Sequence, residues 1–354
     1  MERSKNVLTR IGASKHPNSP VPDGCKRTQS EQDRMGAKLE AVMKKVVIFG
    51  GGSGISCILS GLKLFPMDVT AVIAVSDNGR SSGQLKEELD IPAVGDLGKV
   101  LLSMANVDED FVRLLRYRFK KSGSLHNHPV RNIMLAALID LKGDLTEASR
   151  YMSSLLRVKG TVLPVTAEKV ELIGHGKDQE FIGEVAVGHN VKDIERLSYD
   201  HPIKVDPEIV DRIHDADLII LSPGSLYTSI IPNLLAPAIR QALHETSAPI
   251  MYISNLVTQP GETDGYTVSD HVKVLDQYLG ERRVDIVIAN NEQVDIKTSD
   301  SYTKEKKTLV ELDEDAVRAL GADLEVSDII DIDENGSIRH DALKTAYLVF
   351  SRLM

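Results

Sequence analysis

The sequence predicts an α/β fold in which a parallel sheet carries helices on both faces and a small β-hairpin is inserted. Short apolar runs of strand length alternate with stretches of helical periodicity along most of the chain. Several of these runs are apolar at nearly every position, which is typical of strands covered on both faces. Loops rich in Gly, Ser, Asn and Asp follow them directly, as they do where a parallel sheet ends at a ligand-binding edge.

Strands are predicted where β-branched and apolar residues form short runs bounded by turn residues. They are residues 45–49, 69–75, 218–221, 250–254 and 284–289. Helices are predicted where apolar residues recur at helical spacing. They are residues 55–64, 97–104, 111–119, 132–141, 145–156, 237–243, 269–279 and a closing helix at 339–353. Two further strands, 169–174 and 181–187, flank a Gly-His-Gly-Lys-Asp turn and predict the hairpin.

The chain divides into a leader and one ordered domain. Residues 1–43 are rich in Ser, Pro, Lys, Arg and Asp without sustained periodicity, which predicts a disordered leader. Because Met35 and Met43 stand shortly before the first strand, we hypothesise that translation starts further along than the first residue. Residues 44–354 are predicted to form a single α/β domain, with the hairpin inserted near 165–200.

Composition excludes several classes of protein. Of 354 residues, 42% are hydrophobic and 27% charged, which is ordinary for a globular chain. No apolar run approaches the roughly 18 residues of a membrane span, so no membrane insertion is expected. The net charge of −10 and the lack of a long basic run argue against nucleic-acid binding. Cys25 and Cys57 cannot form a disulfide framework, and with no secretory signal this predicts the cytoplasm.

The first glycine-rich loop, Gly50–Gly54, follows the first strand and opens a helix. Glycines let backbone N–H groups approach an anion, and a helix N-terminus favours one, so this loop is a candidate phosphate site. It lacks the Gly-Lys-Ser/Thr ending of a Walker motif. It also breaks the dinucleotide fingerprint, because Ile55 or Cys57 stands where the third glycine belongs. A tight turn without a ligand remains the alternative.

The second loop contains Asp77, at the position where a dinucleotide-binding protein keeps its ribose-binding acid. Its carboxylate could hold Mg²⁺ against a diphosphate, or it could cap a turn together with Asn78. Further along, Asp96 is predicted as a helix N-cap, with a crevice-facing carboxylate as the alternative. His128 and Asn132 are one helical turn apart and are predicted to face the crevice together, or else to be structural.

Two later loops complete the predicted edge. The loop at 223–229 offers backbone amides and hydroxyls with few charges, which suits hydrogen bonding to a sugar or phosphate. The loop at 258–266 adds acids and an aromatic ring. Tyr266 could stack on a base or ribose, and ordinary packing is the alternative reading of that ring.

These loops carry the resemblance to a known family. Gly50–Ser56, Asp77–Gly83, Asp90–Asp96, Pro223–Ser229 and Pro260–Tyr266 resemble the YvcK family of bacterial gluconeogenesis factors, within the wider CofD-like group. The resemblance extends from Val46 to the region of Arg339. The last two segments are long and specific.

The resemblance implies a Rossmann-like fold that binds a UDP-sugar, such as UDP-N-acetylglucosamine. It implies a role in carbon metabolism, cell shape and cell-wall synthesis. No nucleophile–base pair stands out in the sequence, which favours a binding protein without turnover. By the same resemblance Tyr266 would face the nucleotide, and Arg339 would donate to the diphosphate. A cell-wall or metabolic protein partner and a homodimer are open hypotheses.

The predicted ligand-binding residues follow from the loops and the resemblance together. They are Gly50, Gly51, Gly52, Ser53, Gly54, Asp77, Asn78, Gly79, Ser81, Ser82, Gly83, Asp96, His128, Asn132, Pro223, Gly224, Ser225, Tyr227, Thr228, Asn255, Thr258, Gln259, Glu262, Thr263, Asp264, Tyr266 and Arg339. No catalytic residue and no metal ligand is assigned. No cofactor is certain, and Mg²⁺ is expected only for a transferase.

Two alternatives to a binding protein stay open. The CofD branch of the group comprises Mg²⁺-dependent transferases that use a nucleotide-linked phospholactate donor, and Asp77 and Asp96 would then bind the metal. An NAD(P)-dependent oxidoreductase is less favoured, because the glycine fingerprint is broken.

The chain departs from the family pattern near Arg80 and in two further segments. The family reads Gly-Asp-hydrophobic-Arg-Asn where this chain has Gly95–Lys99, and His-Ser-hydrophobic-Gly-Asn where it has His128–Asn132. An arginine is therefore lost at Gly98 and gained at Arg131. If the two helices face one another, Arg131 replaces the missing guanidinium.

Overall fold

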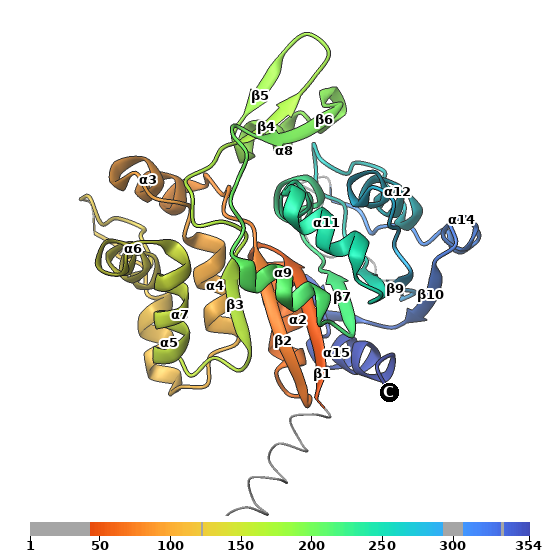
Figure 1. The fold of residues 1–354 in the computed structure, drawn as a ribbon, viewed down its shortest axis with the longest axis horizontal. Coiled ribbons are helices and arrows are strands. Elements are labelled where there is room, and N and C mark those ends of the chain that lie inside the picture. The colour runs from red at the N-terminus through yellow and green to blue at the C-terminus, as the bar shows by residue number, and fades with distance from the viewer. Residues whose placement is uncertain (1–42, 122, 293–306, 334–335) are drawn as a thin grey trace, which may run out of the picture. The chain divides into compact units, whose positions relative to one another are not determined.

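The computed structural model describes residues 43–121, 123–292, 307–333 and 336–354. The predicted leader lies outside the described residues, apart from its last one. The described residues from Met43 onward form one compact unit (Figure 1). No helix in the described part of the chain combines the length and the apolar character needed to cross a bilayer.

The central sheet has seven strands, all parallel to their neighbours, in the order β10-β9-β8-β7-β1-β2-β3. The bounds are β1 Lys44–Gly50, β2 Met67–Ile73, β3 Thr161–Pro164, β7 Leu218–Leu221, β8 Ile250–Ile253, β9 Ile286–Asn290 and β10 Asp323–Ser327. The chain builds outward from β1 to β3, then returns to the other side of β1 with β7. Strand order therefore reverses between β1 and β7, which is where α/β sheets bind ligands.

Helices cover the sheet, as the sequence predicts. The longer ones are α2 Gly52–Leu62, α3 Arg80–Leu89, α4 Gly95–Ser103, α5 Glu109–Arg116, α6 Val130–Lys142, α7 Leu145–Leu155, α9 Pro207–His214, α11 Pro237–Glu245, α12 Val268–Leu279 and α15 Ala342–Ser351. The shorter ones are α8 Glu184–His189, α10 Ile231–Leu234, α14 Glu314–Ala319, η1 Val191–Asp193 and η2 Leu226–Ile230. In Figure 1, α9 and α11 lie in front of the sheet, while α2 and α15 pack together on its other side.

The continuous apolar runs form the buried strands. Val46–Phe49 of β1 and Leu218–Leu221 of β7 are almost fully buried, because helices cover both faces of the sheet. The same sequence pattern at β8 and β9 gives the same result, so these predicted strands are confirmed to within two residues at each end. The α/β class with a parallel sheet and helices on both faces is confirmed.

The predicted hairpin is present as part of a three-stranded antiparallel sheet, ordered β5-β4-β6, that projects above the central sheet in Figure 1. Its strands are β4 Leu172–His175, β5 Glu180–Ile182 and β6 Arg196–Tyr199. The prediction of a second strand through residue 187 was wrong. Gly183 has a positive φ of 90° that ends β5, and the helix α8 follows.

Other boundaries also differ from the prediction. The loop predicted through Gly83 ends earlier, since α3 begins at Arg80. The closing helix begins at Ala342 and not at residue 339, because the Asp341 carboxylate caps the helix by accepting from two backbone N–H groups. Residues 338–340 instead form β12 Ile338–His340, which pairs with β11 Ile330–Ile332. The short strands β3, β6 and β10 were not predicted.

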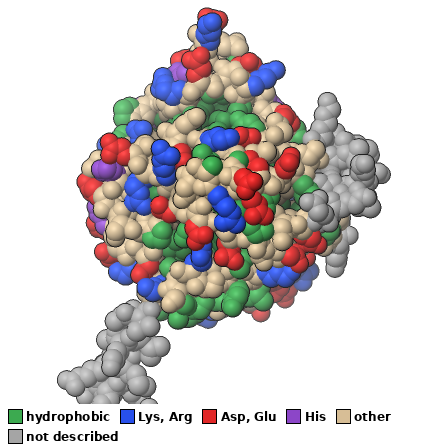
Figure 2. Space-filling model, turned by 90° about the vertical axis from the view of Figure 1, so that its right-hand side faces the viewer, with side chains coloured by type: hydrophobic (Ala, Val, Ile, Leu, Met, Phe, Trp, Pro, Cys, Tyr) green, Lys and Arg blue, Asp and Glu red, His purple; other side chains and the backbone are tan. Residues whose placement is uncertain are grey.

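The surface has no continuous field of one charge on the face drawn in Figure 2. Acidic and basic side chains are interspersed there, with small apolar areas between them. This pattern is ordinary for a globular protein with an excess of acids.

Candidate functional site

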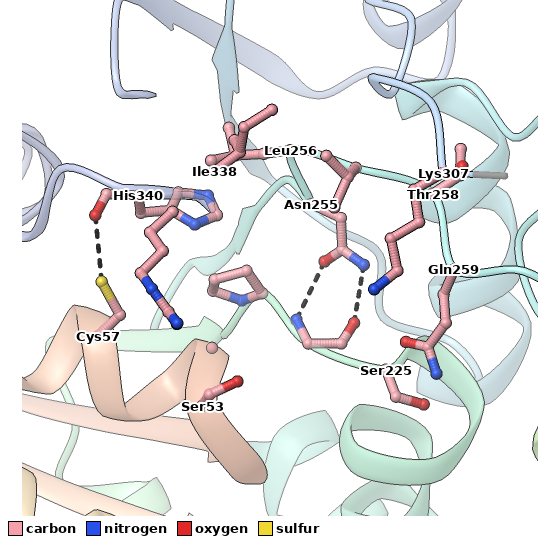
Figure 3. A pocket seen from close by; sticks show the side chains of 15 residues that line it. Ser53, Cys57, Ser225, Asn255, Leu256, Thr258, Gln259, Lys307, Ile338 and His340 are labelled. Atoms are coloured by element: carbon pink, nitrogen blue, oxygen red, sulfur yellow. Dashed lines mark hydrogen bonds between the residues drawn. The ribbon is translucent and has the colours of Figure 1, made fainter. Parts of the chain in front are cut away.

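A crevice of about 430 Å³ lies at the reversal of strand order, at the carboxyl ends of β1, β7 and β8 (Figure 3). We call it the switch-point crevice. It is lined by Ser53, Gly54, Cys57, Pro223, Gly224, Ser225, Asn255, Leu256, Val257, Thr258, Gln259, Lys307, Ile338, Arg339 and His340. Its volume is within the range of about 300–1,000 Å³ that small-molecule sites occupy.

The first wall is the N-terminal part of α2, which packs directly on the loop after β7. A Cβ added at Gly54 would lie 2.1 Å from the Pro223 carbonyl oxygen. Only glycine permits this approach of two backbones. The helix N-terminus with its partial positive charge therefore reaches the crevice, where it favours an anion.

The second wall is held by the side chain of Asn255, which follows β8. Its Nδ2 donates to the Gly224 carbonyl at 2.7 Å, and its Oδ1 accepts from the Gly224 N–H at 3.1 Å (Figure 3). Both polar ends of this amide are thus used to fix the loop. Asn255 lines the crevice mainly as a positioning residue for Gly224.

Glu262 fixes the same loop from beneath. Its carboxylate accepts from the Ser225 hydroxyl at 2.8 Å and from the Tyr227 N–H at 2.9 Å. The side chain is only 3% exposed, and this burial raises its pKa to about 7. The predicted Glu262 therefore organises the crevice without lining it.

The third wall is β12. The Nε2–H of its buried His340 donates to the Ser254 carbonyl, 3.0 Å away, and the backbone carbonyl of His340 accepts from the Cys57 thiol at 3.1 Å. Burial lowers the pKa of His340 to about 4, so the ring is neutral and structural. Arg339, the residue before it, pairs with Asp333 through Nε at 3.1 Å and lines the crevice.

The lining of the crevice carries positive charge. Among its described residues, Lys307 and Arg339 are cationic and none is acidic. Figure 3 shows Ser53 and Lys307 on opposite sides of the cavity. Hydroxyl, amide and backbone groups make up much of the remaining lining. This combination is suited to an anionic ligand with several hydrogen-bonding groups.

The carboxylate of Asp96 lies against Gly51 and Gly52 of the first glycine-rich loop. Asp96 accepts a hydrogen bond from the Gly52 N–H and pairs with Lys99 at 2.8 Å. A Cβ at Gly51 would lie 2.9 Å from its Oδ2. Asp96 thus occupies part of the space that the sequence analysis assigned to a phosphate. It is also not the N-cap of its helix, since Val94 holds that position and Asp96 lies in the first turn.

Two more carboxylates, Asp77 and Glu184, lie near Asp96. The Asp77 carboxylate accepts from the Gly79 N–H at 2.8 Å. This hydrogen bond caps a turn, which was the alternative to metal binding in the sequence analysis. Glu184 accepts from the Asn78 N–H at 3.2 Å. Within the described ranges, no three His, Cys, Asp or Glu side chains converge closely enough to hold a metal ion.

Glu184 makes stability depend on pH. Burial, followed by the charge of Asp77, raises its pKa to about 8 from an ordinary value near 4.5. Between these values the folded state keeps a proton that the unfolded state releases, so the free energy of unfolding falls as pH rises. Glu262 acts in the same direction up to about pH 7. We expect the Tm to drop by several degrees between pH 5.5 and 8.5, at about 2–4 °C per kcal/mol.

Melting curves of Glu184→Gln over the same pH range test this expectation. Glutamine cannot titrate, so the decline should become shallower. Glu281→Gln removes an exposed carboxylate, 85% exposed, and should keep the full decline. Equal slopes in the Glu184→Gln and wild-type proteins would contradict the assignment.

Other predicted residues form a separate cluster between α3 and α6. The Ser81 hydroxyl lies 2.9 Å from His128 Nδ1 and accepts from Asn132 Nδ2 at 3.2 Å. His128 and Asn132 do lie together, as predicted, but both contact α3 and neither lines the crevice. Nearby, the Ser82 hydroxyl accepts from the Gly95 N–H.

Tyr266 also lies outside the lining. Its hydroxyl is 3.1 Å from that of Tyr227, and its ring meets His271 edge-on with centroids 5.5 Å apart. Thr263 and Asp264 accept from backbone N–H groups of their own loop. These residues shape the loop after β8.

The predicted residues therefore fall into two sets. Those that line the crevice are Ser53, Gly54, Pro223, Gly224, Ser225, Asn255, Thr258, Gln259 and Arg339. Those that do not line it are Gly50, Gly51, Gly52, Asp77, Asn78, Gly79, Ser81, Ser82, Gly83, Asp96, His128, Asn132, Tyr227, Thr228, Glu262, Thr263, Asp264 and Tyr266. Sequence reasoning missed Cys57, Leu256, Val257, Lys307, Ile338 and His340 as lining residues.

Comparisons with known proteins find relatives among CofD-like proteins and gluconeogenesis factors. The family model described as 2-phospho-L-lactate transferase CofD matches residues 46–330. The gluconeogenesis factor of Bacillus subtilis is 40% identical over 312 residues, which cover 87% of this chain and 98% of that protein. The putative gluconeogenesis factor of Thermotoga maritima is 39% identical over 309 residues, which cover 86% of this chain and 98% of that protein. A crystal structure of a Bacillus halodurans protein aligns with a TM-score of 0.83 at 36% identity, covering 87% of this chain and 99% of that one.

Proposed function

Because the chain belongs to the CofD family and within it to the gluconeogenesis factors, we propose that it is a cytoplasmic regulatory factor that binds a UDP-sugar in the switch-point crevice. Its role would lie in gluconeogenic growth, cell shape and cell-wall synthesis, as the names of its relatives and the family resemblance imply. The relatives are named as factors and not as enzymes.

The observation that carries the proposal is the chemistry of the crevice. A helix N-terminus, two cationic side chains and a series of hydroxyl and amide groups meet at the reversal of strand order. Diphosphate, ribose and sugar hydroxyls are the groups that such a lining binds.

Calorimetric titration with UDP-N-acetylglucosamine tests the proposal. The variant Arg339→Ala tests whether Arg339 contacts the ligand. We expect Arg339→Ala to weaken binding by roughly tenfold to a hundredfold, since a charge-assisted hydrogen bond is worth about 1.5–3 kcal/mol. The ligand should also raise the Tm of the wild-type protein, because it stabilises the folded state by about 2.7 kcal/mol at a hundredfold excess over Kd.

Arg318→Ala is the matched control, because Arg318 is similarly exposed, at 53% against 50%, and lies on α14 away from the crevice. It should bind as the wild type does. If no UDP-sugar binds to the folded wild-type protein, the proposal is wrong.

A second candidate function is a transferase of the CofD type. The family match over residues 46–330 favours it. Incubation with Mg²⁺, a nucleotide-linked phospholactate donor and a deazaflavin acceptor would distinguish it, since product formation would show turnover.

A further inference from the structure

A second cavity of about 540 Å³ adjoins the switch-point crevice between α2, α4, α5, α6 and β12. We call it the Arg131 cavity. It shares Ser53, Cys57 and Arg339 with the crevice, so one ligand can extend through both. This cavity is not needed to explain nucleotide binding at the first site.

The Arg131 cavity is strongly basic in a protein with a net charge of −10. Its cationic lining residues are Lys63, Lys99, Arg116, Arg131 and Arg339, against a single carboxylate, that of Glu109. Such a concentration of charge in a partly closed space attracts an anion more strongly than the same charges on an open surface.

Several of these cations already have partners. Lys99 pairs with Asp96, and Lys63 donates to the carbonyl oxygens of Ser103 and Ala105. Arg131 and Arg116 form no ion pair with the described part of the chain. The surplus positive charge of the cavity is therefore centred on two arginines.

Arg131 is the more unusual of the two. It is only 6% exposed, and its buried Nε has no hydrogen-bond partner. Burial, together with the charges of Arg118 and Arg116, lowers its pKa to about 10. The nearby Asp96 carboxylate acts in the opposite direction but forms no ion pair with Arg131. A buried guanidinium without an ion-paired carboxylate is unfavourable, and a bound anion would compensate it.

The position of Arg131 is fixed by α4. Its Cδ and Cγ lie 3.3 Å and 3.5 Å from where a Cβ on Gly98 would be. The side chain therefore runs across the helix at Gly98, which has no side chain of its own. The two helices face one another, which meets the condition stated for Arg131 in the sequence analysis, and Gly98 makes room for the Arg131 side chain.

We propose that the Arg131 cavity binds an acid group on the sugar of the nucleotide ligand, so that the preferred ligand is a UDP-sugar with a carboxylate. This proposal rests on the proposed function. Lys307, Arg339 and the N-terminus of α2 would serve the diphosphate in the crevice. Arg131 and Arg116 would bind the additional negative charge.

The test compares UDP-glucose with UDP-glucuronate, which differ only in a hydroxymethyl group against a carboxylate. Calorimetric titration of the full chain should give a Kd at least tenfold lower for UDP-glucuronate. The preference should shrink as NaCl is raised, because it is electrostatic. Equal affinities, or tighter binding of UDP-glucose, would overturn the inference while leaving UDP-sugar binding intact. If neither nucleotide binds, both the proposed function and this inference are wrong.

Variants connect the preference to the cavity. Arg131→Gln should abolish the preference for UDP-glucuronate and leave the affinity for UDP-glucose within about twofold. Arg116→Gln should reduce the preference as well and, being at an exposed residue, keeps the test available if Arg131→Gln does not fold. Arg113→Gln is the control, since Arg113 lies on the same helix, is 74% exposed and does not line the cavity. A preference that persists in both Arg131→Gln and Arg116→Gln would overturn the assignment.

Discussion

Gly54→Ala is expected to destabilise the fold by roughly 3 kcal/mol and to abolish binding of UDP-sugars. The added Cβ would lie 2.1 Å from the Pro223 oxygen, 2.7 Å from the Pro223 carbonyl carbon and 3.2 Å from the Gly224 Cα. All three are backbone atoms, so no side chain can rotate away to relieve the overlap. The helix α2 and the loop after β7 would have to separate, and these are two walls of the switch-point crevice.

Chemical denaturation followed by circular dichroism measures the loss of stability, and calorimetry measures the loss of binding. Gly98→Ala is the control for stability, since it also places a methyl group within a helix. Its Cβ would meet only side-chain atoms of Leu135 and Arg131, at 3.2 Å and 3.3 Å, and these can shift. Its stability should stay within about 1 kcal/mol of wild type. A Gly54→Ala protein as stable as Gly98→Ala would show that the two walls do not touch in solution.

Glu262→Ala is expected to cost about 3 kcal/mol and to weaken UDP-sugar binding by more than tenfold. The substitution leaves the buried Tyr227 N–H without its acceptor and removes both contacts of the Ser225 hydroxyl to the carboxylate. Each unsatisfied buried group costs about 1–3 kcal/mol, and the lost side-chain volume adds a cavity. Because Ser225 lines the crevice, the loop that contacts the ligand would lose its support.

Glu262→Gln separates hydrogen bonding from charge. Its amide oxygen can still accept from the Tyr227 N–H, so most of the stability should remain, and urea denaturation of both variants side by side measures the difference. The pKa of Glu262 is raised to about 7, so the glutamine variant should match wild type most closely below that pH. Equal losses in Glu262→Ala and Glu262→Gln would mean that the acceptor role assigned to this carboxylate is wrong.

The central strands could be predicted because strands that are buried on both faces have apolar residues at nearly every position. The runs at β1, β7 and β8 are apolar throughout, and loops of small and polar residues end them. β10 was missed although Asp323–Ser327 alternates polar and apolar residues, which is the pattern of a half-buried strand at the edge of a sheet. β3 was missed because only Val162 and Leu163 carry its apolar signal.

The candidate site could be predicted only in part. Loops that follow strands were assigned to one edge correctly, because parallel strands share that edge. That Asp96 faces the glycine loop depends on how α2 and α4 cross, and no local pattern shows it. The start of α15 was within reach, since Asp341 before an apolar helix is an N-cap signal. This signal places Arg339 before the helix and not within it.

The order of the strands has a consequence during synthesis. β1 takes its place between β2 and β7, yet Leu218 begins 168 residues after Gly50 ends β1. At a translation rate of about 5–20 residues per second, one edge of this apolar strand waits roughly ten to thirty seconds for its neighbour. An unpaired apolar edge is a template for pairing with other chains. In the nascent protein, this edge of β1 is therefore open to pairing with other chains until β7 has been synthesised.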